Sequence, residues 1–158
     1  MRIRIVVANQ AEAVFFDMES RGDEPRFTTR LSDSQAHLHD RDFKSDRPGR
    51  VFDHAPLAGG RRGATGHHGT GGERKPRKHE AELFAHRVAE QLLDAQSEFD
   101  RLVVIAAPAF LGLLRKALPR PVRSRVAAEV AKDLVNEAPA ALRTHVPPDV
   151  FQEMLAAQ

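Results

Sequence analysis

The stretch "FDRLVVIAAPAFLGLLRKAL", residues 99–118, carries the clearest structural pattern of this 158-residue chain. Residues 101–107 form a short apolar run, which is typical of a β-strand buried on both faces of a sheet. Pro108 then suits the first turn of a helix, where the N–H that proline lacks would have no partner. The stretch therefore predicts a buried strand followed directly by a helix, whose core-facing residues are Phe110, Leu111, Leu114 and Leu118.

The segment before this stretch has the periodicity of an amphipathic helix that begins near His79. Its apolar residues recur every three or four positions, whereas Arg87 and Glu90 fall on other sides. A helix followed by a buried strand predicts an α/β layer. The residues expected to face the core are Ala81, Phe84, Ala85, Val88, Leu92 and Ala95.

The N-terminal region has the composition of three short strands. Residues 2–8 and 26–32 alternate in hydropathy over part of their length, and residues 13–19 are rich in strand formers. Short turns at 9–10 and 20–23 would join them into an antiparallel meander. Together with the α/β layer, this predicts an α/β (α+β) fold with a mixed sheet and helices.

Residues 119–158 leave two interpretations open. Apolar residues recur every four positions between Val122 and Leu134, which indicates a helix, but residues 126–134 also fit one face of a strand. Farther along, Asn136 is a candidate cap for a short helix through Arg143. The sequence at 147–149, Pro-Pro-Asp, would open a last helix to about Ala157.

Periodicity is lost over residues 33–78, and we expect a long, flexible, glycine-rich loop there. Only Val51 and Phe52 are suited to anchor it. The net charge of the chain is +2, but the end of this segment has six basic residues and one acid, Glu73, a local charge of 6 − 1 = +5. Such a cluster favours nucleic-acid binding, with a solvated basic loop as the alternative. The candidate RNA-binding residues are Arg61, Arg62, Arg74, Lys75, Arg77 and Lys78.

Several classes of function have no support in the composition. The chain has no cysteine, which excludes disulfides, thiolate zinc sites and cysteine nucleophiles. The apolar runs at 5–8 and 102–114 are too short for a signal peptide core or for a membrane span of about 18 residues. We therefore expect a cytoplasmic protein without a membrane partner. No phosphate-loop motif is present. The histidines near the glycine-rich segment are poorly spaced for a metal site: His54, His67, His68 and His79. We therefore expect neither a cofactor nor a metal.

Four segments together resemble the bacterial host attachment protein family: "RPGRVFDH", "KHEAELFAHRVAEQLLD", "FDRLVVIAAPAFLGLLRKAL" and "VAKDLV". That family is similar in turn to the middle domain of the class-I translation release factors of eukaryotes and archaea. The resemblance covers nearly the whole chain and is strongest over residues 69–134. It implies a single domain over residues 1–158 with a ribonuclease-H-like fold. It also implies a short helix at 120–125, followed by a strand over about 126–134.

The release-factor middle domain carries a Gly-Gly-Gln loop, preceded by a His-Gly pair. Here "HGTGGER", residues 68–74, is in the matching place, so the resemblance makes His68, Gly71, Gly72 and Glu73 the candidate catalytic loop. Glu73 departs from the pattern because it replaces the glutamine that helps to place the attacking water. An ionised carboxylate accepts hydrogen bonds but donates none, and RNA would repel it. We therefore expect a binding protein rather than an enzyme.

Three functional hypotheses follow. The first is a translation-associated protein that binds the ribosome or tRNA, non-catalytic and related to stress or hibernation. The alternative is a host attachment protein that interacts at a surface, with a protein partner. A weaker alternative is a hydrolase of peptidyl-tRNA or another RNA ester.

Overall fold

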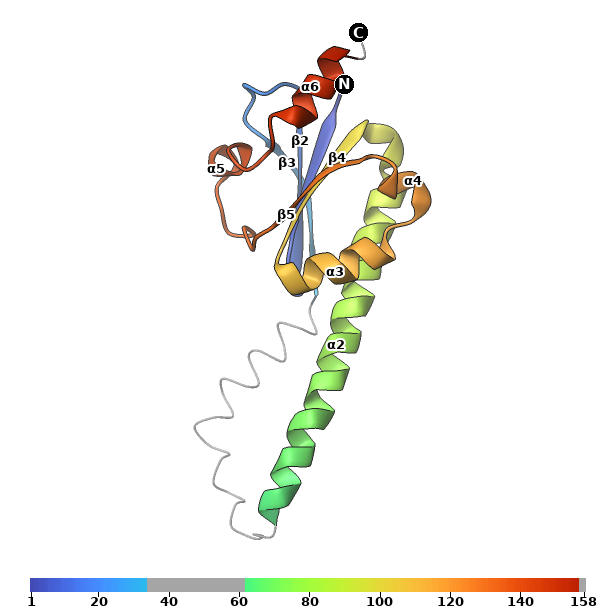
Figure 1. Ribbon diagram of the computed structural model, residues 1–158, viewed down its shortest axis with the longest axis vertical. Helices are drawn as coiled ribbons and strands as arrows, with labels where there is room; N and C mark the ends of the chain where they lie inside the picture. Colours follow the sequence, from blue (N-terminus) through green and yellow to red (C-terminus); the bar gives the residue numbers. More distant parts are fainter. Residues whose placement is uncertain (34–61, 157–158) are drawn as a thin grey trace.

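The computed structural model describes the backbone of residues 1–33 and 62–156, and the side chains of residues 1–33 and 77–152. These parts contain one five-stranded sheet with the strand order β3-β2-β1-β4-β5 (Figure 1). The strands are β1 (Ile3–Ala8), β2 (Glu12–Met18), β3 (Arg26–Ser32), β4 (Arg101–Ala106) and β5 (Val126–Ala131).

The sheet is mixed, and β1 is its central strand. It pairs antiparallel with β2 and parallel with β4, while β3 and β5 extend the sheet on either side. All six residues of β1 are buried, because helices cover both faces of the sheet at its centre. The expected antiparallel meander of the first three strands is confirmed, and so is the α+β fold class with a mixed sheet.

The helices are α2 (Arg62–Asp94), α3 (Pro108–Ala117), α4 (Arg120–Arg123), α5 (Pro139–Arg143) and α6 (Asp149–Ala156), with a 3₁₀ turn η1 (Gln96–Glu98) before β4. The predicted strand and helix within residues 99–118 are confirmed as β4 and α3. Pro108 occupies the first turn of α3, and the backbone N–H of Leu118 closes the helix by donating to the carbonyl of Leu114 at 3.0 Å.

Three helices cover the first face of the sheet. The C-terminal part of α2 packs there together with α3 and α4, against side chains of β1, β2 and β4. The rings of Phe84 on α2 and Phe110 on α3 have centroids 5.8 Å apart, and both side chains are buried. Of the apolar positions expected on this helix, Phe84, Ala85, Val88 and Leu92 are buried in this core. Ala81 is partly exposed, and Ala95 is buried just after the end of α2.

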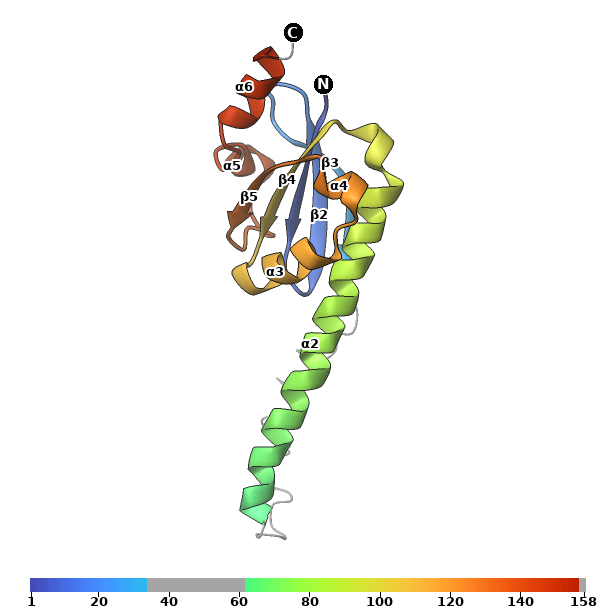
Figure 2. The same cartoon turned by 45° about the vertical axis from the view of Figure 1, so that its right-hand side comes forward.

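The opposite face is covered by the C-terminal segment. The chain after β5 returns across the sheet and places Val135, Leu142, Val146 and Val150 on the alternate side chains of β1, β2 and β4. Figure 2 shows α5 and α6 on the side of the sheet away from α2. Because both faces are covered, β1 and β4 lie between two hydrophobic layers.

The segment whose periodicity was ambiguous divides into two elements. Arg120–Arg123 form α4, and Val126–Ala131 form β5, as the family resemblance implies. The expected cap at Asn136 is wrong, because α5 begins at Pro139 after Ala138 and has no side-chain cap. Proline fixes φ near the helical value, so Pro139 sets the start of this helix.

Helix α2 begins at Arg62 rather than near His79, which corrects the expected loop over residues 62–78. Figures 1 and 2 both show its N-terminal part extending well beyond the sheet. Once the packed turns from Phe84 onward form a nucleus, each added helical residue gains one hydrogen bond, and Arg, Lys and Glu are good helix formers. These favourable effects act against the low helix propensity of five glycines and of Pro76, which provides no N–H for the helix. Residues 34–61, with the predicted anchors Val51 and Phe52, lie outside the described residues.

Candidate functional site

Most of the residues predicted to bind RNA or to form a catalytic loop belong to the N-terminal part of α2. Arg61 lies outside the described residues, and Arg77 and Lys78 have described, exposed side chains. For the remaining predicted residues the structure describes the helical backbone but not the side chains. These are Arg62, His68, Gly71, Gly72, Glu73, Arg74 and Lys75.

The helical backbone changes the role expected of the glycines. The resemblance implies a loop in which Gly71 and Gly72 adopt backbone angles that other residues avoid. An α-helix has negative φ throughout, which every residue adopts readily. In this structure the Gly-Gly-Glu segment is therefore part of a helix and not a loop.

Among the predicted residues with described side chains, Lys78 lies beside a second helix. It lines a groove between α2 and α3, together with Lys116 of α3. Both side chains are exposed. Sequence reasoning had not connected Lys116 with the basic cluster, because 38 positions separate the two lysines along the chain.

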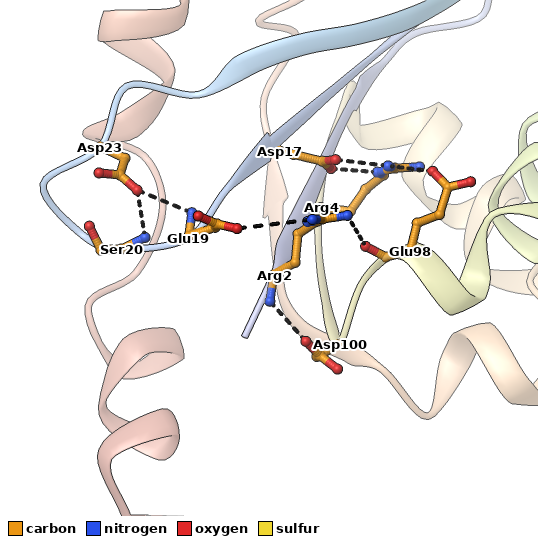
Figure 3. A network of polar contacts seen from close by, with 8 residues as sticks. All are labelled: Arg2, Arg4, Asp17, Glu19, Ser20, Asp23, Glu98 and Asp100. Atoms are coloured by element: carbon orange, nitrogen blue, oxygen red, sulfur yellow. Dashed lines mark hydrogen bonds and ion pairs between the residues drawn. The ribbon is translucent and has the colours of Figure 1, made fainter.

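A second group of charged residues lies at the N-terminal ends of β1 and β4 (Figure 3). Its centre is Arg4, whose side chain is only 2% exposed. The guanidinium donates two parallel hydrogen bonds to Asp17, from Nε to Oδ1 at 2.7 Å and from Nη2 to Oδ2 at 2.9 Å. Nη2 also lies 3.4 Å from Oε1 of Glu98. A buried arginine is thus matched by a bidentate carboxylate and a second acid.

The environment of Arg4 favours its charged form. Burial alone disfavours the charge, but the hydrogen bonds and negative charges of Asp17 and Glu98 outweigh it and raise the pKa of Arg4. The guanidinium carbon also lies 5.4 Å from the centre of the Phe99 ring. Arg4 therefore stays protonated wherever the protein is folded.

Neighbouring polar groups tie the same end of the sheet together. The backbone N–H of Arg2 donates to Oδ2 of Asp100 at 2.8 Å, and its guanidinium donates to the carbonyl of Glu98 at 3.2 Å. Arg125 donates to the carbonyls of Gln96 and Phe99. These contacts link β1, η1, β4 and the segment before β5, so we interpret the group as a structural network.

The predicted turn at 20–23 is confirmed and has its own polar stabilisation. The carboxylate of Asp23 accepts hydrogen bonds from the backbone N–H groups of Ser20, at 2.9 Å, and Glu19, at 3.3 Å (Figure 3). Hydrogen bonds from Ser20 lower the pKa of Asp23 below its ordinary value. The turn is best stabilised when this carboxylate is ionised.

Across the parts of the chain with described structure, none of the helices combines the length and the apolar character needed to span a membrane.

Comparison with known proteins identifies the family of the chain. Residues 4–146 match the sequence model of a family described as "protein required for attachment to host cells". No curated protein matches the chain. The family match includes the five strands, apart from the first residue of β1, and the helices α2 to α5. It also includes Arg4 and both of its acidic partners, Asp17 and Glu98. Because it covers most of the chain, the protein belongs to this host attachment family.

Proposed function

We propose that this protein takes part in attachment to host cells as a binding protein. The observation that carries the proposal is the family match over residues 4–146. The N-terminal part of α2 offers a surface for a partner, because it extends beyond the sheet and carries Arg77 and Lys78 in exposed positions. Its concentration of basic residues favours an acidic partner surface.

The attachment proposal predicts that cells lacking the protein attach poorly to host cells. Attachment is measured by counting adherent cells for the deletion strain and for the strain with the gene restored. A variant with Arg77→Gln and Lys78→Gln is expected to restore attachment less than the wild type does. The control variant, Arg21→Gln with Lys132→Gln, removes two exposed charges elsewhere and is expected to restore it fully. Normal attachment by the deletion strain would contradict the proposal.

The location of the protein decides how such a role would operate. We propose a cytoplasmic location, and fractionation of the same cells tests it. A cytoplasmic protein whose deletion reduces attachment would act indirectly, through a partner inside the cell. Recovery at the cell surface would contradict the cytoplasmic location and leave the attachment role in place.

A second candidate function is binding to the ribosome or to tRNA. The specific observation is that five of the six predicted RNA-binding residues lie on the extended part of α2: Arg62, Arg74, Lys75, Arg77 and Lys78. We further propose a release-factor-like, ribonuclease-H-like domain over residues 1–158, supported by the mixed sheet and by the order α2, β4, α3, α4, β5. Glu73 in place of glutamine supports a non-catalytic role.

Replacing four basic residues tests the RNA candidate. Alanine at Arg61, Arg62, Arg74 and Lys75 is expected to weaken binding to ribosomes or tRNA. Each lost phosphate contact should reduce the slope of log K against log salt concentration by roughly 0.7 to 0.9. Sedimentation with ribosomes and tRNA titrations at several salt concentrations measure both effects. Unchanged binding in the fourfold variant would contradict the candidate.

A second variant tests the acidic residue of the same segment. Glu73→Gln should strengthen binding to RNA modestly, because it removes a charge that repels the phosphates.

A further inference from the structure

The groove between α2 and α3 is lined by cationic side chains from both helices. From α2 come Lys78, Glu82 and His86, which are spaced at intervals of four and therefore share one side of the helix. From α3 come Leu113, Lys116 and Ala117, and the groove encloses about 180 Å³. Two ammonium groups, an imidazole and one carboxylate thus line a single concave surface.

The basic side chains of this groove have no polar partner within the part of the chain that the structure describes. The side chains of Lys78, His86 and Lys116 form no hydrogen bond or ion pair with another described residue. The neighbour of Lys116 behaves differently, because Arg115 is paired with Glu129 through a contact of 2.7 Å. Of these two adjacent cations, Arg115 is therefore paired within the protein, whereas Lys116 lines the groove without a paired carboxylate.

The charge of the groove favours an anion. Two lysines that line the same groove repel each other, and the lining carboxylate, Glu82, forms no ion pair with either of them. A phosphate group can accept hydrogen bonds from several N–H donors at once, which suits ammonium groups from two sides and an imidazole N–H. Such a ligand would relieve the repulsion between the two lysines.

The packing beneath the groove holds its two walls in place. Phe84 on α2 and Phe110 on α3 are in contact in the core, and Leu114 of α3 is fully buried beside them. These residues fix how α2 and α3 lie relative to each other, so the supports of Lys78 and Lys116 are rigid before any ligand arrives. Leu113 and Ala117 give the groove an apolar wall, which favours a phosphate joined to an organic group over a free ion.

We propose that the α2–α3 groove binds the phosphate group of a nucleotide, either free or within an RNA chain. Lys78 and Lys116 contact the phosphate oxygens, His86 donates one further hydrogen bond, and Leu113 contacts the attached sugar. The inference does not rest on the attachment role, because a deletion strain that attaches normally would leave the groove and its ligand unchanged.

Titrations of the full-length protein test this site. Uridine monophosphate is added to isotope-labelled protein, and the backbone amide signals of residues 78–86 and 113–117 are followed by NMR. We expect a saturable shift of these signals, with weaker binding of inorganic phosphate and none of uridine. Lys78→Gln with Lys116→Gln should weaken binding about tenfold or more, because two charge-assisted contacts are lost. The control Arg21→Gln, an exposed charge in the β2–β3 turn, should bind like the wild type.

Glu82→Gln is expected to raise the affinity for the nucleotide, whereas the double-lysine variant lowers it. Removing the carboxylate from the groove should strengthen binding by about two- to fivefold, since it repels the phosphate from a partly exposed position where water screens the repulsion. A short oligouridylate that binds more tightly than the mononucleotide would identify RNA as the source of the phosphate, and equal binding would identify a free nucleotide. The proposal is overturned if uridine monophosphate causes no saturable shift, or if the double-lysine variant binds as well as Arg21→Gln.

Discussion

Replacing Arg4 with alanine is expected to lower the free energy of unfolding by about 3 to 5 kcal/mol. The change removes the guanidinium that donates two hydrogen bonds to the carboxylate of Asp17. Because the Asp17 side chain is only 13% exposed, its charge is then left largely buried and unpaired. It also removes the guanidinium that lies over Phe99 in the core. Urea unfolding followed by circular dichroism measures the loss, and the melting temperature should fall by roughly 10 °C.

Two further variants separate the charge of Arg4 from its packing. Arg4→Met with Asp17→Leu removes both charges and keeps much of the volume, so it should recover most of the stability lost in Arg4→Ala. Arg2→Ala changes an exposed arginine two positions earlier, and should alter the free energy by less than about 1 kcal/mol. If Arg4→Ala were no more harmful than Arg2→Ala, the bidentate pair would not stabilise the sheet.

The elements that sequence reasoning predicted correctly are those with a strong local pattern. The apolar run at 101–106 and the helical spacing from Phe84 to Leu92 each identify an element without knowledge of the rest of the chain. The region around Val126 fits two periods equally well. Its pairing with β4 decides the matter, because residues 126–131 gain backbone partners there that a helix would not use.

The polar groups were harder to predict because they depend on register. Arg4 lies within an apolar strand and Asp17 lies between Phe16 and Met18, and only the pairing of β1 with β2 places the two directly opposite each other. An isolated charge of opposite sign in each of two adjacent predicted strands is the signal that could have found this pair. Lys78 and Lys116 share a groove because α2 and α3 pack together, which neither helix reveals alone.

The extent of α2 shows a different limit of sequence reasoning. Five glycines and Pro76 before Arg77 predict a loop on local propensity, since glycine costs about 1 kcal/mol and proline about 3 kcal/mol within a helix. The structure continues the helix through them to Arg62. The resemblance to the release-factor loop also predicted a loop at residues 68–74, so neither argument indicated the helix.

Replacing Phe84 with alanine is expected to cost about 3 to 5 kcal/mol of stability and to loosen α2 from α3. Phe84 is fully buried on α2, its ring meets Phe110 of α3, and the guanidinium of Arg87 lies 5.5 Å from the ring centre. Leu83 is the matched control, because it precedes Phe84 on the same turn but is 52% exposed, so Leu83→Ala should change stability by less than about 0.5 kcal/mol. Denaturant unfolding of the wild type, Phe84→Ala and Leu83→Ala measures the loss of stability in each variant.

The same two variants test whether the packing of α2 against α3 affects binding in the groove. If Phe84 and Phe110 hold the two helices in place, Phe84→Ala should weaken phosphate binding in the groove even under conditions where the protein remains folded. Leu83→Ala should leave both the groove and the stability unchanged. Equal losses of stability in the two variants would show that α2 does not pack on the sheet through the face that carries Phe84, Val88 and Leu92. Because Lys78 and Lys116 lie on the two helices that Phe84 and Phe110 bring into contact, the position of one ammonium group relative to the other depends on the packing of α2 against α3.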